Sequence, residues 1–116
     1  MSTKTPDDPK PPYYAAIFTS NRTKVDDGYH QTSLQMEELV KQQDGYLGHE
    51  SVRGNDGFGI TISYWRDLES IHSWKKNYEH LLAQKDGKKK WYKSYRVRIC
   101  RVERDYNFSN QADQST

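Results

Sequence analysis

The chain has 116 residues, which is enough for a single domain. Apolar residues make up 33% of it and charged residues 29%, and the net charge of +2 reflects basic residues balanced by acids, so a nucleic-acid partner is not indicated. No stretch approaches the roughly 18 apolar residues that a membrane-spanning helix needs, and the first residues lack the apolar core of a signal peptide. The one cysteine, Cys100, cannot form an intrachain disulfide, so we expect a cytoplasmic protein.

The two ends of the chain differ in composition from its middle. Residues 1–12 hold all four prolines and are expected to form a disordered arm. Residues 107–116 are mostly polar and are expected to form a disordered tail. The folded domain is therefore predicted to cover residues 13–106.

The first part of this domain predicts a strand followed by a helix. Residues 13–19 are apolar at successive positions, which is typical of a strand covered on both faces. From residue 29 to residue 43, apolar side chains recur at steps of three and four, which indicates one face of a helix. Asp26 or Asp27 is expected to cap this helix, and Gly45 follows its end.

The middle of the chain predicts a β-hairpin. Residues 46–53 and 58–65 are expected to be paired strands, joined by a turn at residues 54–57 that contains two glycines. Successive side chains of a strand point to opposite faces of the sheet, so every second residue shares a face. One face of the second strand is expected to carry small side chains and then a large one, at Gly59, Thr61, Ser63 and Trp65.

A second helix and a last strand complete the domain. Asp67 is expected to cap the helix, Gly87 to end or break it, and residues 95–103 to form the strand. The order β-α-β-β-α-β predicts an α+β ferredoxin-like fold, in which two helices cover one face of a four-stranded antiparallel sheet. The other face carries apolar and aromatic residues, so we expect a homodimer through the open sheet faces.

Several short motifs between residues 13 and 106 resemble the antibiotic biosynthesis monooxygenase (ABM) domain family. They are Gly45-Tyr46-Leu47-Gly48 with Glu50-Ser51, Ser63-Tyr64-Trp65, Trp74, Glu79-His80, Ala83-Gln84, Trp91-Tyr92, Tyr95 and Arg101-Val102-Glu103-Arg104. The resemblance implies a dimeric α+β barrel. The family includes cofactor-independent monooxygenases that form quinones, haem-degrading monooxygenases and members without known activity, so the resemblance implies a site without fixing its chemistry.

The haem-degrading relatives use an asparagine near the end of the first strand, a tryptophan near the end of the third and a histidine ligand on the second helix. Asn21 and Trp65 stand at similar places in this chain. The ligand position falls closest to Gln84, a poor iron ligand, while His80 lies one helical turn earlier. This departure counts against haem degradation. No spacing of histidine, cysteine or carboxylate residues predicts another metal site.

His80 is the sequence candidate for proton chemistry, because a histidine exchanges protons near neutral pH. A surface or packing histidine is the alternative interpretation. Trp65, Trp74 and Tyr78 are candidates for walling a pocket for a planar ligand, or else belong to an ordinary core. Trp91 is expected to close that pocket or to contact the partner subunit.

Two further residues are given structural roles by their surroundings in the sequence. Glu50 is expected to share a strand face with Tyr46 and, if it is buried, to form an ion pair with Arg96 or Arg98. A catalytic base is the alternative interpretation of Glu50. Cys100 is expected to be an inert buried thiol in the middle of the last strand.

Three functions compete on this evidence. The first is an ABM-type monooxygenase that oxidises a small phenolic or quinol-like aromatic compound with dioxygen, without metal or flavin. In it, Trp65, Trp74, Tyr78 and Trp91 bind the substrate, Asn21 orients a substrate oxygen and His80 takes a proton. The second is a non-catalytic dimer that binds a small ligand or haem, and the third is haem degradation.

Overall fold

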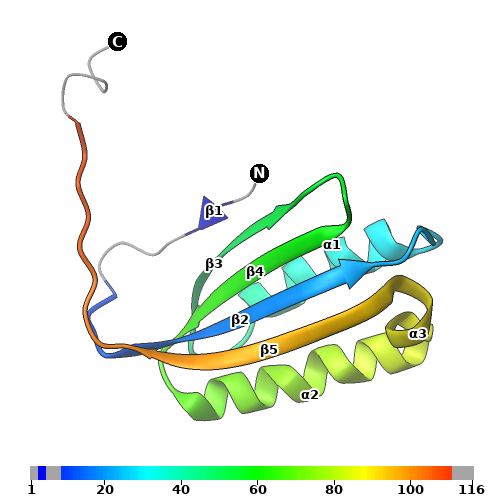
Figure 1. Ribbon diagram of the computed structural model, residues 1–116. Helices are drawn as coiled ribbons and strands as arrows, with labels where there is room; N and C mark the ends of the chain where they lie inside the picture. Colours follow the sequence, from blue (N-terminus) through cyan, green and yellow to red (C-terminus); the bar gives the residue numbers. More distant parts are fainter. Residues whose placement is uncertain (1–2, 5–8, 111–116) are drawn as a thin grey trace.

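The computed structural model describes residues 3–4 and 9–110. Its elements in chain order are β1 (Thr3–Lys4), β2 (Tyr13–Arg22), α1 (Tyr29–Lys41), β3 (Tyr46–Arg53), β4 (Phe58–Trp65), α2 (Leu68–Lys85), α3 (Gly87–Trp91) and β5 (Tyr92–Val102). Residues 103–110 continue from β5 without helix or strand (Figure 1). None of the helices in the described part of the chain has the length and apolar character of a membrane span.

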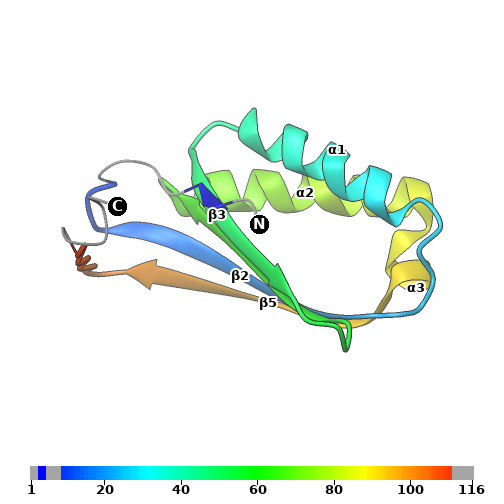
Figure 2. The ribbon, with the colours of Figure 1, turned by 90° about the horizontal axis from the view of Figure 1, so that it is seen from above.

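The strands form one antiparallel sheet in the order β1-β3-β4-β2-β5. Both long helices lie on the same side of this sheet, which leaves its other side uncovered (Figure 2). Strands β2 to β5 with α1 and α2 are the predicted ferredoxin-like arrangement, so the predicted fold class is confirmed. Assembly into a dimeric barrel stays a prediction.

Strand β1 adds a short edge within the segment that was expected to be disordered. Thr3 pairs with Glu50 and Lys4 pairs with His49. The edge strand β3 presents unpaired backbone groups, and such a row accepts another strand whatever its side chains are. Residues 1–2 and 5–8 of the expected arm lie outside the described residues, as do residues 111–116 of the expected tail.

The two helices begin in different ways. Asp67 caps α2 as expected, because its side chain accepts a hydrogen bond from the backbone N–H of Ser70 at 2.8 Å. The expectation that Asp26 or Asp27 caps α1 is wrong. Gly28 holds the cap position with φ of 76°, and the Asp26 carboxylate instead pairs with Arg22 at 3.2 Å. Glycine adopts this left-handed backbone at low cost, so no side-chain cap is needed to turn the chain into the helix.

A β-bulge in β3 changes which side chains face the helices. Tyr46 pairs with Trp65 and Gly48 pairs with Tyr64, so Leu47 is an extra residue on this strand. Tyr46 and His49 consequently lie on the same, helix-facing side. Simple alternation had placed Tyr46 with Glu50, and that expectation is wrong because the bulge interrupts the period of two.

The core is centred on Trp65, which is 0% exposed and packs with Ala16, Val40 and Ile71. Its indole N–H donates to Ser63 Oγ at 2.8 Å, so the ring buries no unpaired polar atom. Tyr46 and Trp74 pack against the same cluster from β3 and α2. The sheet and both helices are therefore joined around one indole ring.

The uncovered side of the sheet differs from expectation at two residues. Glu50 accepts a hydrogen bond from the Tyr64 hydroxyl at 2.6 Å, so the expected ion pair with Arg96 or Arg98 is not formed. Cys100, which was expected to be buried, is exposed because it lies on the edge strand β5 and no helix covers that side.

Replacing Gly45 by alanine should destabilise the fold at the start of β3. Its φ is 81°, and an added Cβ would lie 2.1 Å from Ser70 Oγ and 2.7 Å from Ser70 Cβ. Left-handed backbone strain and overpacking together predict a loss of about 2–4 kcal/mol in the free energy of unfolding, measured by urea denaturation. Gly54→Ala is the matched control, because its Cβ would lie 3.0 Å from the flexible Asp56 side chain and at an ordinary 3.8 Å from the Phe58 carbonyl oxygen, and it should change stability by less than about 1 kcal/mol. Equal losses in the two variants would contradict this account.

Candidate functional site

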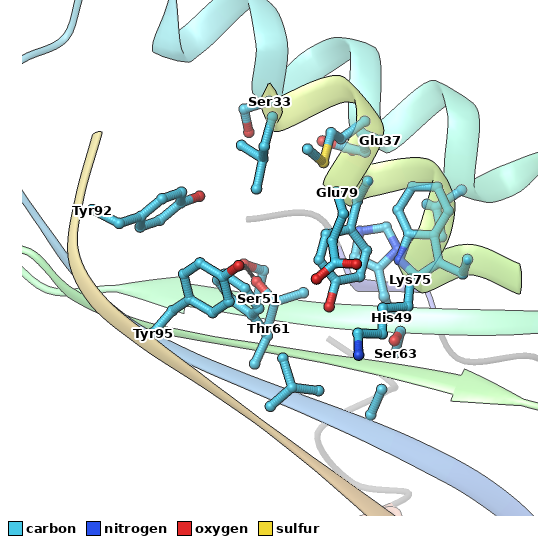
Figure 3. Close-up of a pocket in the computed structure, with 18 of the residues that line it drawn as sticks. Ser33, Glu37, His49, Ser51, Thr61, Ser63, Lys75, Glu79, Tyr92 and Tyr95 are labelled. Atoms are coloured by element: carbon cyan, nitrogen blue, oxygen red, sulfur yellow. Dashed lines mark hydrogen bonds between the residues drawn. The ribbon is translucent and has the colours of Figure 1, made fainter. Parts of the chain in front are cut away.

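A cavity of about 590 Å³ lies between the two long helices and the helix-facing side of the sheet (Figure 3). Small side chains on that side of the sheet leave the space, and they are Ala16, Ser51, Thr61 and Ser63. Of the four residues expected to share this face of β4, Thr61 and Ser63 line the cavity, whereas Gly59 and Trp65 do not. The volume falls within the range typical of small-molecule sites.

Aromatic side chains form much of the cavity wall. Trp74 and Tyr78 contribute from α2, with ring centroids 5.8 Å apart, and Trp91 contributes from α3. Tyr92 and Tyr95 line the cavity from β5 (Figure 3). Burial raises the pKa of Tyr78 to about 12, with nearby Tyr95 and Glu79 adding to the shift, so its hydroxyl stays protonated at neutral pH.

Trp65 supports this wall without being part of it. Its ring stacks on Trp74 at 6.3 Å between centroids, on the side of Trp74 that faces the core, and it does not itself line the cavity. Of the predicted binding residues, Trp74, Tyr78 and Trp91 thus line the cavity and Trp65 lies behind them. Trp91 is held in place by its indole N–H, which donates to the backbone carbonyl of Asp27 at 2.8 Å.

His49 is a cavity residue to which no role was assigned from the sequence. It is 7% exposed, and its Nδ1 lies 2.5 Å from the Tyr46 hydroxyl oxygen. Burial lowers the pKa of His49, while nearby Glu37 opposes the shift and Lys41 adds to it. The ring is therefore neutral at pH 7. The register of β3 against β4 would have indicated that His49 lines the cavity, because it pairs His49 with Ser63, next to the pair Ser51 and Thr61.

Charged side chains also reach the cavity. Glu37, Lys75 and Glu79 line it from the two helices. In the described part of the chain, none of these has an ion-pair partner within 4.0 Å. Their charges are thus available to a bound molecule. On the sheet, the hydroxyls of Ser51 and Thr61 are 2.8 Å apart and form a polar floor.

The structure does not bring the two predicted catalytic residues to the cavity. His80 is exposed on α2, where its neighbour Glu79 takes the position that faces the cavity. Asn21 is exposed, and its side-chain amide donates to Ser94 Oγ at 3.3 Å. Alternation along β2 explains this placement, because Ala16 and Phe18 line the cavity and an odd-numbered residue faces the other side of the sheet.

The two positions considered for an axial haem ligand do not reach the cavity. Gln84 and His80, the positions considered for an axial ligand, are both exposed on α2 and do not line the cavity. Among the described residues there is also no group of three or more histidine, cysteine or carboxylate side chains placed to hold a metal ion.

Comparison with known proteins gives one family and a consistent fold. The profile of the family described as Monooxygenase af470-like matches residues 19–101. The uncharacterized protein YqjZ of Bacillus subtilis (strain 168) is 44% identical over 105 residues, which cover 90% of this chain and 92% of that protein.

Solved structures share the fold at low sequence identity. SnoaB, a cofactor-independent oxygenase from Streptomyces nogalater, superposes with a TM-score of 0.66 at 9% identity, covering 81% of this chain and 96% of that one. A candidate antibiotic biosynthesis monooxygenase from Deinococcus radiodurans gives a TM-score of 0.56 at 12% identity, covering 84% and 99%. Together with the family match, these structures confirm the predicted resemblance to the ABM domain family.

The lowered pKa of His49 should link stability to pH. As the pH falls below the ordinary histidine value of about 6.5, the unfolded chain takes up a proton at this residue before the folded chain does. The contribution of His49 to the free energy of unfolding is then complete above pH 6.5 and declines as the pH falls toward the folded pKa. An NMR titration of the ring should give a midpoint below 6.5, and His49→Gln should flatten the pH dependence in that window. A midpoint above 6.5 would contradict the assignment.

Proposed function

The chain belongs to the Monooxygenase af470-like family, and on this basis we propose that it oxidises a small, electron-rich aromatic compound of the phenolic or quinol type with dioxygen, without a bound metal or flavin. The observation that carries the proposal is the cavity of about 590 Å³, which combines an aromatic wall with a buried neutral histidine. An aromatic wall binds a planar ring, and a few polar groups fix its orientation.

The ring of the substrate lies against Trp74 and Tyr78, with its oxygen toward His49 and the polar floor of the sheet. In Figure 3, His49, Ser63 and Lys75 are labelled on one side of the cavity and Tyr92 and Tyr95 of β5 on the other. Glu79, which reaches the cavity without an ion-pair partner, is the group assigned to take the substrate proton. In this assignment it replaces His80, which lies outside the cavity.

The reaction balances without an external reductant. Proton loss from a ring carbon that carries two hydrogens, the keto form of a phenol, gives a carbanion whose charge is shared with the ring oxygen. That carbanion transfers electrons to dioxygen and a C–O bond forms, giving a hydroperoxide. Loss of water from the hydroperoxide breaks the O–O bond and leaves a carbonyl group, so one oxygen atom enters the product and the other leaves as water. The substrate carbon supplies all four electrons.

The test is oxygen uptake with a panel of naphthols, dihydroxynaphthalenes and anthrones, with product analysis under ¹⁸O₂. A monooxygenase should place one labelled atom in a quinone product for each dioxygen consumed. Uptake that yields hydrogen peroxide without label in the product would contradict the proposal. Saturable binding of these compounds without uptake would instead indicate a non-catalytic ligand-binding protein.

A matched pair of histidine variants tests the site itself. His49→Ala removes the buried cavity histidine and should lower kcat by about 10²-fold, the usual effect of losing one polar group that stabilises developing charge. His80→Ala removes an exposed histidine from outside the cavity and should leave kcat within about twofold. Binding of 2-naphthol, followed by quenching of tryptophan fluorescence, checks that both variants retain the pocket. The reverse result would restore His80 as the functional histidine.

A further inference from the structure

The two ring nitrogens of His49 have different surroundings. Nδ1 lies 2.5 Å from the hydroxyl oxygen of Tyr46. Nε2 has no hydrogen-bond partner in the described part of the chain. Every buried side-chain nitrogen or oxygen there does have a partner, so an unpartnered Nε2 is not a buried atom. Nε2 is therefore accessible. Since His49 lines the cavity, this nitrogen is the one that a bound molecule can reach.

The direction of the bond between Tyr46 and His49 follows from the chemistry of the two groups. A neutral imidazole has one N–H donor and one bare nitrogen acceptor, whereas a phenol hydroxyl can donate or accept. A phenol O–H is a stronger donor than an imidazole N–H, and a bare imidazole nitrogen is a stronger acceptor than a phenol oxygen. Tyr46 therefore donates to Nδ1, and the single proton of the neutral ring lies on Nε2.

The charged groups around the pair keep both partners neutral. Burial raises the pKa of Tyr46, and the Glu37 carboxylate on α1 raises it further, so the hydroxyl keeps its proton. Burial lowers the pKa of His49, with Lys41 on α1 acting in the same direction and Glu37 against it. Lys75 and Glu79 face the cavity from α2.

The bulge at Leu47 is what makes this contact possible. In an unbroken strand, residues three apart point to opposite faces. The extra residue between Tyr46 and Gly48 returns Tyr46 to the face of His49. The ring of Tyr46 is then fixed against Trp65, with centroids 5.7 Å apart, so its hydroxyl is held by the core.

We propose that Tyr46 is a positioning residue that holds His49 as a neutral Nε2–H donor, which stabilises an anionic oxygen on the aromatic substrate. His49 is then an electrophilic group and not the base. The substrate part of this inference rests on the proposed function, whereas the protonation of the ring does not. A donor aimed at a phenolate or enolate oxygen favours the carbanion that reacts with dioxygen.

The protonation of the ring is tested by ¹⁵N NMR on the full chain at pH 7.5, without any substrate. We expect the Nδ1 signal of His49 at the frequency of a bare, hydrogen-bonded nitrogen and the Nε2 signal at that of a protonated one. Tyr46→Phe should shift the Nδ1 signal, because it removes the donor. Tyr64→Phe is the matched control: it removes a tyrosine hydroxyl that binds Glu50 on the other side of the sheet, and it should leave both signals in place. A protonated Nδ1 in the unmodified protein would overturn the proposal.

The role toward an anionic oxygen is tested with 4-nitrophenol, whose ionised form is coloured. The dye should bind with an apparent pKa below that in water, and Tyr46→Phe should move this value back toward that of the free dye while Tyr64→Phe does not. No binding, or an unchanged dye pKa, would overturn this role even if the NMR result holds.

With a substrate, Tyr46→Phe should lower kcat about tenfold with little change in KM. If the NMR and dye results hold but no oxygen uptake is found, the proposed function fails and the role of Tyr46 stands.

Discussion

The packing of Trp65 is the interaction on which both the fold and the cavity depend. The ring is fully buried at the end of β4, where it meets Ala16 from β2, Val40 from α1 and Ile71 from α2. Because this contact joins the helices to the sheet at one end, β3 and β4 need not fill the whole interior beside it with large side chains. Ser51, Thr61 and Ser63 stand there, and open space remains between these strands and the helices. Close packing at one point thus permits a cavity next to it.

The fold could be predicted because its signals are periodic and local. Alternation in β4, the helical stripe of α2 and the Asp67 cap each specify an element without reference to distant residues. The site was harder to predict. No local sequence pattern marks the bulge at Leu47, so strict alternation places Tyr46 and His49 on opposite faces of β3. Their contact could therefore not be predicted from the sequence. His80 was favoured because histidine is reactive in general, although its helical position turns it to the surface.

The cavity brings together two kinds of surface that seldom meet without a function. One side offers aromatic faces from α2 and β5, and the other offers hydroxyl groups and an imidazole from β3 and β4. A flat molecule with oxygen on one edge satisfies both. The polar floor comes from β3 and β4, which pair with each other along this stretch, so the sheet fixes the positions of its hydroxyl groups. The helices carry Glu37, Lys75 and Glu79, and these side chains are long enough to adjust to different ligands.

The open volume above the sheet has a consequence for how the protein responds to heat. Apolar side chains that line it, such as Ile71 and Leu82, make fewer contacts than they would in a filled interior. A molecule that enters completes their packing and binds the folded chain but not the unfolded one. At 100 times its dissociation constant, such a ligand stabilises the native state by about 2.7 kcal/mol. The melting temperature of this domain therefore depends on what the cavity holds, and the occupant acts as the missing part of the hydrophobic core.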